Sequence, residues 1–138
     1  MAINRTQHSF DMQQGSYIPG TCNLGFEEVE KRRRNIKIGL LTAILGIIFI
    51  TYFNFSREWR LLIFIPLFYS ALCYFQVRQK FCVVYGVLGI FNFGKLGNSQ
   101  KVIDDESKRL DKKRAIQILF ISLSTSLIAT VVYYLLPV

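Results

Sequence analysis

Side chains that could act as nucleophiles, acids or metal ligands are few and widely separated in this sequence. The single histidine, His8, lies near the N-terminus, and the three cysteines are Cys22, Cys73 and Cys82. Their spacings contain neither the C-x-x-C pairs of zinc and iron sites nor the H-E-x-x-H pattern of metalloproteases. Walker loops, dinucleotide glycine fingerprints and nucleophile elbows do not occur either. We therefore expect a protein that is not an enzyme, holds no metal or cofactor and has no recognisable small-molecule substrate.

Composition and charge place the chain among membrane proteins. Of its 138 residues, 51% are hydrophobic and 19% are charged, and the net charge is +8. Soluble domains carry about a quarter charged residues, and disordered chains are poorer in apolar and aromatic residues. The odd number of cysteines also argues against a disulfide scaffold. The remaining class is a small, basic, integral membrane protein.

Stretches without a charged residue identify the candidate spans, because a charge at the bilayer centre costs about 2.5–3.5 kcal/mol or more. Four such stretches that are rich in apolar residues stand out: 19 residues from 38 to 56, 17 from 61 to 77, 14 from 81 to 94, and 24 from 115 to 138. A helix needs about 20 residues to cross, and runs of about 10–14 are more typical of interfacial, re-entrant or core segments. The first, second and fourth stretches are therefore span candidates, and the third is ambiguous.

The distribution of positive charge resolves the ambiguous stretch. With three spans, 15 of the 17 Lys and Arg residues lie on one side, and only Arg57 and Arg60 lie on the other. If residues 81–94 crossed as well, the division would be eight against nine. Because cytoplasmic loops carry an excess of Lys and Arg, the sequence favours three spans with the N-terminus inside and the C-terminus outside.

The predicted fold is an all-α integral membrane protein with three transmembrane helices. An interfacial or re-entrant segment lies on its cytoplasmic side, and a charged helical stalk leads into the last span. The chain divides into an irregular inner-side tail (1–25), a long helix and membrane hairpin (26–78, spans at about 36–55 and 61–77), an apolar, glycine-rich interfacial segment (79–98) and a charged helix continuing into the third span (99–138, span at about 115–136).

Small residues recur at helical spacing on the first and third spans. Such residues let helices approach closely, and their hydroxyls can hydrogen-bond across the contact. We predict that they form packing faces, which either close the protein's own bundle or bind a neighbouring protein. They are Gly39, Ala43 and Gly46 on the first span, and Ser122, Ser126, Ala129 and Thr130 on the third.

Two further surfaces on the inner side are candidates for binding. The cluster Lys31, Arg32, Arg33 and Arg34 is expected at the level of the lipid phosphates, either as an orientation signal or as a site for anionic lipid. The apolar segment 81–94 is the candidate protein-contact surface. Its predicted contact residues are the aromatic ones, Phe81, Tyr85, Phe91 and Phe93.

These observations favour a non-catalytic accessory or assembly subunit of a multi-subunit membrane complex, an energy-transducing complex being one candidate. Its expected partners are other membrane subunits and anionic lipids. Nucleic acid is not expected, because acidic residues are interleaved with the basic ones in the charged helix. The alternatives are a self-associating transporter or channel lined by Ser122, Ser126 and Thr130, and a membrane thiol or redox protein using Cys73 and Cys82. The charge asymmetry favours a bacterial inner membrane, with an organellar inner membrane as the alternative.

Overall fold

The computed structural model describes residues 17–92 and 100–138 of the chain. These residues are mostly helical, and three of the helical segments, at 26–52, 57–79 and 105–135, are long and apolar enough to cross a membrane. The expectation of a mostly helical protein with three helices suited to cross a membrane is thus confirmed.

Helix α2 runs from Phe26 to Tyr52 and is 27 residues long, or about 40 Å at the rise of an α-helix. Its first turn carries Glu27 and Glu28, and carboxylates at this end interact favourably with the helix dipole. After α2 the chain reverses at Asn54, whose φ of 51° is left-handed, a conformation that asparagine adopts more readily than most residues.

The second candidate span consists of two kinds of helix. A 3-10 helix, η1 (Arg57–Ile63), leads directly into the α-helix α3 (Phe64–Gln79). Pro66 lies in the first turn of α3, where proline is tolerated because the first N–H groups of an α-helix have no partner within it. Lys80 ends α3 in a left-handed conformation.

Short elements fill the chain between α3 and the last helix. Helix α4 (Val83–Leu88) is followed by two antiparallel strands, β1 (Ile90–Phe91) and β2 (Gln100–Lys101). Residues 17–25 contact this region through a bridge between Leu24 and Asn92. We call residues 17–25 and 82–92, the latter including α4 and β1, together with β2 the cap.

Helix α5 (Asp105–Leu135) joins the charged segment and the last apolar segment in one continuous helix of 31 residues. Its N-cap is Asp104, whose carboxylate accepts a hydrogen bond from the Ser107 main-chain N at 3.1 Å. Hydrogen bonds from Ser107 hold the pKa of Asp104 below its ordinary value. The helix begins at Asp105 and not at the expected residue 99, because Gln100 and Lys101 pair with β1.

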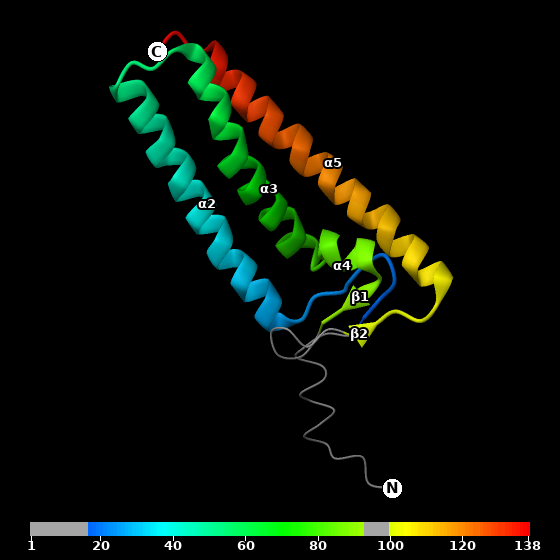
Figure 1. Ribbon diagram of the computed structural model, residues 1–138. Coiled ribbons are helices and arrows are strands. Elements are labelled where there is room, and N and C mark those ends of the chain that lie inside the picture. The colour runs from blue at the N-terminus through cyan, green and yellow to red at the C-terminus, as the bar shows by residue number, and fades with distance from the viewer. Residues whose placement is uncertain (1–16, 93–99) are drawn as a thin grey trace, which may run out of the picture.

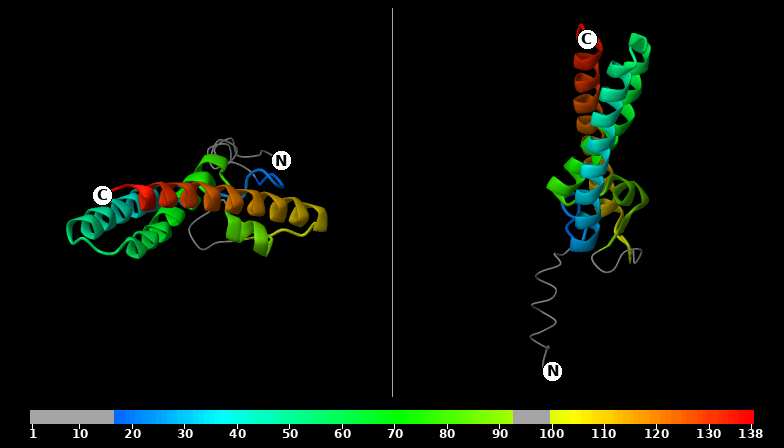
Figure 2. Two further views of the ribbon diagram at one scale, coloured as in Figure 1. Left: turned by 90° about the horizontal axis from the view of Figure 1, so that it is seen from above. Right: turned by 90° about the vertical axis from the view of Figure 1, so that its left-hand side faces the viewer.

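The three long helices form a single layer with α3 in the middle (Figure 1). In the view turned by 90° about the vertical axis, the three helices overlap in a narrow column (Figure 2, right). The cap lies at one end of this layer, the cap end, and η1 with the C-terminal residues lies at the other, the hairpin end. An apolar cluster near the hairpin end consists of Ala43, Ile50, Ile63 and Tyr133, and another next to the cap consists of Phe81, Ala115 and Ile118.

A buried arginine closes the hairpin end. The guanidinium of Arg60 donates to the Leu136 carbonyl oxygen at 2.8 Å and to the Val138 main-chain oxygen. It also lies over the ring of Tyr133, 5.5 Å from the centroid. Arg60 therefore fastens η1 to the end of α5, and of the two cations at this end only Arg57 is exposed.

The predicted small-residue faces lie mainly inside the protein's own helix layer. Gly39 and Ala43 are buried, and Gly39 faces Ser70 and Tyr69 of α3. On α5, the buried residues include Ser122, Ser126 and Thr130, whereas Ala129 is exposed.

The expected hydrogen bonds across the helix contact are not formed by the α5 hydroxyls. Each donates to the carbonyl four residues earlier in its own helix: Ser122 to Ile118 at 2.8 Å, Ser126 to Ser122 at 2.9 Å, and Thr130 to Ser126 at 2.8 Å. The main-chain carbonyl is the nearest acceptor for a hydroxyl in an apolar helix face. These residues therefore contribute close packing and not interhelical polar contacts.

Replacing Gly39 by alanine is expected to destabilise the protein by about 1–3 kcal/mol, the usual effect of overpacking. A Cβ at this position would overlap Ser70 Oγ and lie 3.3 Å from the Tyr69 ring. Chemical unfolding in detergent micelles measures the effect. The matched control is Gly46→Ala, whose Cβ would meet only the flexible end of Ile63, at 2.8 Å. Adding Ser70→Ala should restore the stability of the Gly39→Ala variant. Equal losses of stability in the Gly39→Ala and Gly46→Ala variants would contradict a close packing contact between Gly39 and α3.

Candidate functional site

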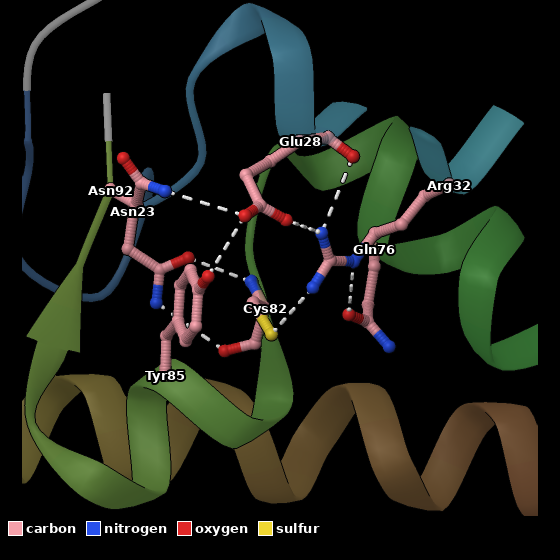
Figure 3. A network of polar contacts seen from close by, with 7 residues as sticks. All are labelled: Asn23, Glu28, Arg32, Gln76, Cys82, Tyr85 and Asn92. Carbon is pink, nitrogen blue, oxygen red and sulfur yellow. Dashed lines mark hydrogen bonds and ion pairs between the residues drawn. The ribbon is translucent and has the colours of Figure 1, made fainter. Parts of the chain in front are cut away.

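A network of polar side chains occupies the junction between the cap, α2 and α3 (Figure 3). Its members come from four separate parts of the chain, and most are buried. They are Asn23 from residues 17–25 of the cap, Glu28 and Arg32 from α2, Gln76 from α3, and Cys82, Tyr85 and Asn92 from residues 82–92 of the cap.

An ion pair lies at the centre of the network. Arg32 Nη1 and Glu28 Oε2 are 2.6 Å apart, and the two side chains are 15% and 6% exposed. The residues are one helical turn apart on α2, so the backbone itself brings them together. A pair this far from water is stable only when its remaining hydrogen-bonding atoms are also satisfied.

The other nitrogens of Arg32 reach the neighbouring elements. Nε donates to Gln76 Oε1 at 3.0 Å, and Nη2 donates to Cys82 Sγ at 3.0 Å. The planar guanidinium has donors in several directions, which allows one side chain to bind α2, α3 and the cap at once. Arg32 is therefore the common point of the network.

The second oxygen of Glu28 binds the cap. Its Oε1 accepts hydrogen bonds from Tyr85 OH at 3.0 Å and from Asn92 Nδ2 at 3.3 Å. Burial and the neighbouring Glu28 carboxylate raise the pKa of Tyr85 above its ordinary value. Tyr85 thus stays a neutral donor at physiological pH, and both oxygens of Glu28 are engaged.

Asn23 completes the junction by binding the backbone of Cys82. Its Oδ1 accepts from Cys82 N at 2.7 Å, and its Nδ2 donates to the Cys82 carbonyl at 3.3 Å. The backbone extends the contact, with Asn23 N donating to the Lys80 carbonyl and Gly25 N to the Asn92 carbonyl. The N-terminal segment is thereby joined to the beginning of α4.

A second buried carboxylate holds the other side of the cap. Asp111 of α5 is fully buried, and it accepts hydrogen bonds from Tyr17 OH at 2.6 Å and from Gly20 N at 2.7 Å. Tyr17 in turn stacks on Phe91, with the ring centroids 4.6 Å apart. Burial, followed by the contact with Asp111, raises the pKa of Tyr17 above its ordinary value. The cap is thus fixed to α2 by one buried acid and to α5 by another.

This arrangement binds the protein's own segments to each other. Each charged group of the network has a partner within the chain, and such fully satisfied buried networks rigidify a fold. Among residues 17–92 and 100–138, no three His, Cys, Asp or Glu side chains are grouped so that they could hold a metal ion. The thiols of Cys22, Cys73 and Cys82 are free.

The basic cluster predicted to face lipid headgroups is divided by the structure. Lys31, Arg33 and Arg34 are exposed, but Arg32 points into the network described above. The i,i+4 contact with Glu28 and the acceptors on α3 and the cap turn Arg32 inward. Arg32 is therefore removed from the set of candidate lipid ligands.

The aromatic residues predicted to contact a partner are used inside the fold. Phe81 is fully buried against Ala115 and Ile118, Tyr85 binds Glu28, and Phe91 stacks on Tyr17. Phe93 lies outside the described residues. The apolar side chains that α4 does expose are different ones, namely Val84, Val87 and Leu88.

One face of the helix layer carries an apolar groove of about 290 Å³. Its lining comes from all three long helices, and half of it consists of small residues. They are Ser70, Ala71, Thr125, Ser126 and Ala129, and the larger lining residues are Ile36, Leu40, Leu67, Tyr74 and Phe75.

Sequence reasoning missed the role of the buried charges, although the helical repeat contains a signal for it. Glu28 and Arg32 lie eleven and seven residues before Gly39, and Asp111 lies eleven before Ser122. Because seven and eleven residues are close to whole numbers of helical turns, these charges share a face with the small residues. A charged residue on a helix face that otherwise consists of packing residues indicates that the charge is buried and paired with another group of the same chain.

No protein-family model matches this chain, and comparison with curated proteins and with solved structures gives no match.

Proposed function

We propose that this protein is a non-catalytic accessory subunit of a membrane complex and that its groove receives a transmembrane helix of another subunit. The observation that carries the proposal is the groove itself, which is apolar, crosses all three helices and has small residues for half of its lining. Small residues on a membrane-embedded face let a second helix approach closely.

The positions of the groove residues favour a helix as the occupant. Thr125 and Ala129 are exposed and lie one turn apart on α5, which is the small-xxx-small spacing of transmembrane helix contacts. The Thr125 hydroxyl already donates to the Ile121 carbonyl at 2.8 Å, so a partner helix need not satisfy it.

The buried polar network supports the same function by fixing the relative positions of the helices. Glu28, Arg32 and Asp111 bind the cap to α2, α3 and α5 at the cap end, and Arg60 binds η1 to α5 at the hairpin end. A groove whose walls are held at both ends is preorganised, which lowers the entropy lost on binding.

We further propose that the cap end faces the cytoplasm and that the membrane is a bacterial inner membrane. Most exposed Lys and Arg side chains lie at the cap end, and Arg57 is the exposed cation of the hairpin end. This asymmetry is typical of the cytoplasmic side. An alkaline phosphatase reporter fused after Val138 should be active, and one fused after Arg114 inactive. The reverse pattern would contradict the orientation.

The groove proposal is tested by filling the groove with a large side chain. We expect Ala129→Trp to reduce co-purification of the partner subunit by roughly tenfold or more, since overpacking an interface costs about 1–3 kcal/mol. The partner is identified beforehand by mass spectrometry after gentle solubilisation of the native chain. The matched control is Ile128→Trp on the adjacent surface of α5, which is 65% exposed and does not line the groove.

The control should retain the partner, and both variants should reach the membrane in equal amounts. Equal retention by Ala129→Trp and Ile128→Trp would reject the groove as the docking surface. Migration of the native chain only as a monomer or homo-oligomer would reject the accessory function altogether.

A further inference from the structure

A second cavity, of about 460 Å³, lies at the cap end between the end of α4 and the first turns of α5. It is distinct from the apolar groove, and none of its lining residues belongs to the polar network. One side is basic, with Lys108, Arg109 and Lys112 of α5, and the other is apolar, with Val87 and Leu88 of α4.

The cavity carries an excess of positive charge. Its single carboxylate, Asp105, approaches Lys108 at 3.7 Å. The Asp105 side chain is 99% exposed, so this pair contributes little to neutralising the site. Neither Arg109 nor Lys112 forms an ion pair within the described part of the chain. Two cations are therefore available to an anionic ligand.

Gly89 positions one of the cations. It ends α4 in a left-handed conformation with φ 69°, and a Cβ there would lie 3.3–3.6 Å from side-chain carbons of Lys108. The aliphatic stem of Lys108 thus passes over Gly89, where it is held against the main chain while the ammonium group approaches the exposed Asp105. The Gly89 carbonyl also accepts from Val102 N at 2.8 Å, which fixes this corner of the cap.

The position of the cavity along the axis of α5 matches the level of lipid headgroups. The uncharged part of α5 begins at Ala115, so Lys112 lies about 4.5 Å and Lys108 about 10 Å below it along the helix axis. Lys and Arg at this level interact with lipid phosphates. On the opposite wall, Val87 and Leu88 are 50% and 65% exposed, an unfavourable placement in water but a suitable one beside the glycerol and upper acyl carbons.

We propose that this cavity binds the phosphate-bearing headgroup of an anionic phospholipid. Arg109 and Lys112 contact the phosphate, and Val87 and Leu88 contact the apolar part of the same molecule. The site is separate from the exposed cluster at Lys31, and it does not depend on the groove or on any partner subunit. The two proposals can therefore fail independently.

The test measures lipid binding to the purified full chain in detergent by native mass spectrometry, with phosphatidylglycerol and phosphatidylcholine as probes. We expect phosphatidylglycerol to bind more tightly. The double variant Arg109→Gln, Lys112→Gln should bind it about 30-fold more weakly, equivalent to about 1 kcal/mol for each cation. The matched control, Lys101→Gln with Lys113→Gln, removes the same charge from exposed positions outside the cavity and should change binding less than about threefold.

Three results would overturn the proposal. Equal binding of both lipids would show that the phosphate charge is not recognised, and equal losses in the two double variants would show unspecific attraction to the basic surface. Displacement of phosphatidylglycerol by equimolar inorganic phosphate or by polyglutamate would assign the cavity to a soluble anion or to an acidic protein segment. Failure of both to compete, together with the loss in the Arg109, Lys112 variant alone, supports the lipid.

Discussion

Replacement of Arg32 by alanine is expected to destabilise the protein by about 3–5 kcal/mol, because it leaves the Glu28 carboxylate buried without its counter-ion. The same change removes the hydrogen bonds from Arg32 to Gln76 and Cys82. Both α3 and the cap would then lose their hydrogen bonds to this side chain of α2, and the cap would be held to α2 by Glu28 through Tyr85 and Asn92. Equilibrium unfolding in detergent micelles measures the loss of free energy.

Two comparisons separate this effect from a general effect of removing a positive charge. Arg33→Ala removes an exposed cation from the next position, whose contact with Glu30 is 3.8 Å long with both side chains 60% exposed, and should cost less than about 1 kcal/mol. The variant Glu28→Gln with Arg32→Gln removes both charges and should be more stable than Arg32→Ala. Equal stability of the Arg32 and Arg33 variants would show that the ion pair does not hold the cap.

Replacement of Asp111 by alanine is expected to destabilise the protein by about 2–4 kcal/mol. It leaves two part-buried donors, Tyr17 OH and Gly20 N, without the acceptors they now have at 2.6 and 2.7 Å, and each unmet donor costs about 1–3 kcal/mol. The segment around residues 17–22 should also become accessible to protease. Limited proteolysis followed by mass spectrometry locates the new cleavage sites.

The controls for Asp111 use the same helix and the same contact. Asp105→Ala removes a carboxylate whose side chain is almost completely exposed and should leave stability and cleavage unchanged within about 0.5 kcal/mol. Tyr17→Phe removes one of the two donors and should produce an intermediate loss. Protection of residues 17–22 in the Asp111→Ala variant would contradict the proposed attachment of the cap to α5.

The long helices could be predicted from the sequence because a membrane imposes a simple local rule. Uncharged stretches of sufficient length coincide with three segments that are long and apolar enough to span. In the 14-residue stretch at 81–94, the described residues 81–92 contain no such helix. Its described residues form the six-residue α4, a glycine turn and a two-residue strand. Length and charge were therefore enough to predict the three long, apolar helices.

The cap could not be predicted in the same way, because its contacts join residues far apart in sequence. Arg32 meets Gln76 and Cys82 across 44 and 50 positions, and Asp111 meets Tyr17 across 94. Composition and periodicity describe neighbours within a few turns, so they can relate Glu28 to Arg32 one turn later but not to the residues that surround this pair. Phe81 illustrates the same limit: an apolar residue in a short segment can equally face a partner or Ala115 of its own chain.

The fastening of the hairpin end by Arg60 has a consequence for the order in which the protein is assembled. Its acceptors, Leu136 and Val138, follow Arg60 by 76 and 78 residues, so during synthesis the first two spans are complete long before the acceptors exist. Until α5 has formed, the Arg60 guanidinium lacks these acceptors and has to hydrogen-bond to water or to other polar groups. Docking of the last residues of the chain is therefore the step that buries the Arg60 guanidinium and closes the hairpin end.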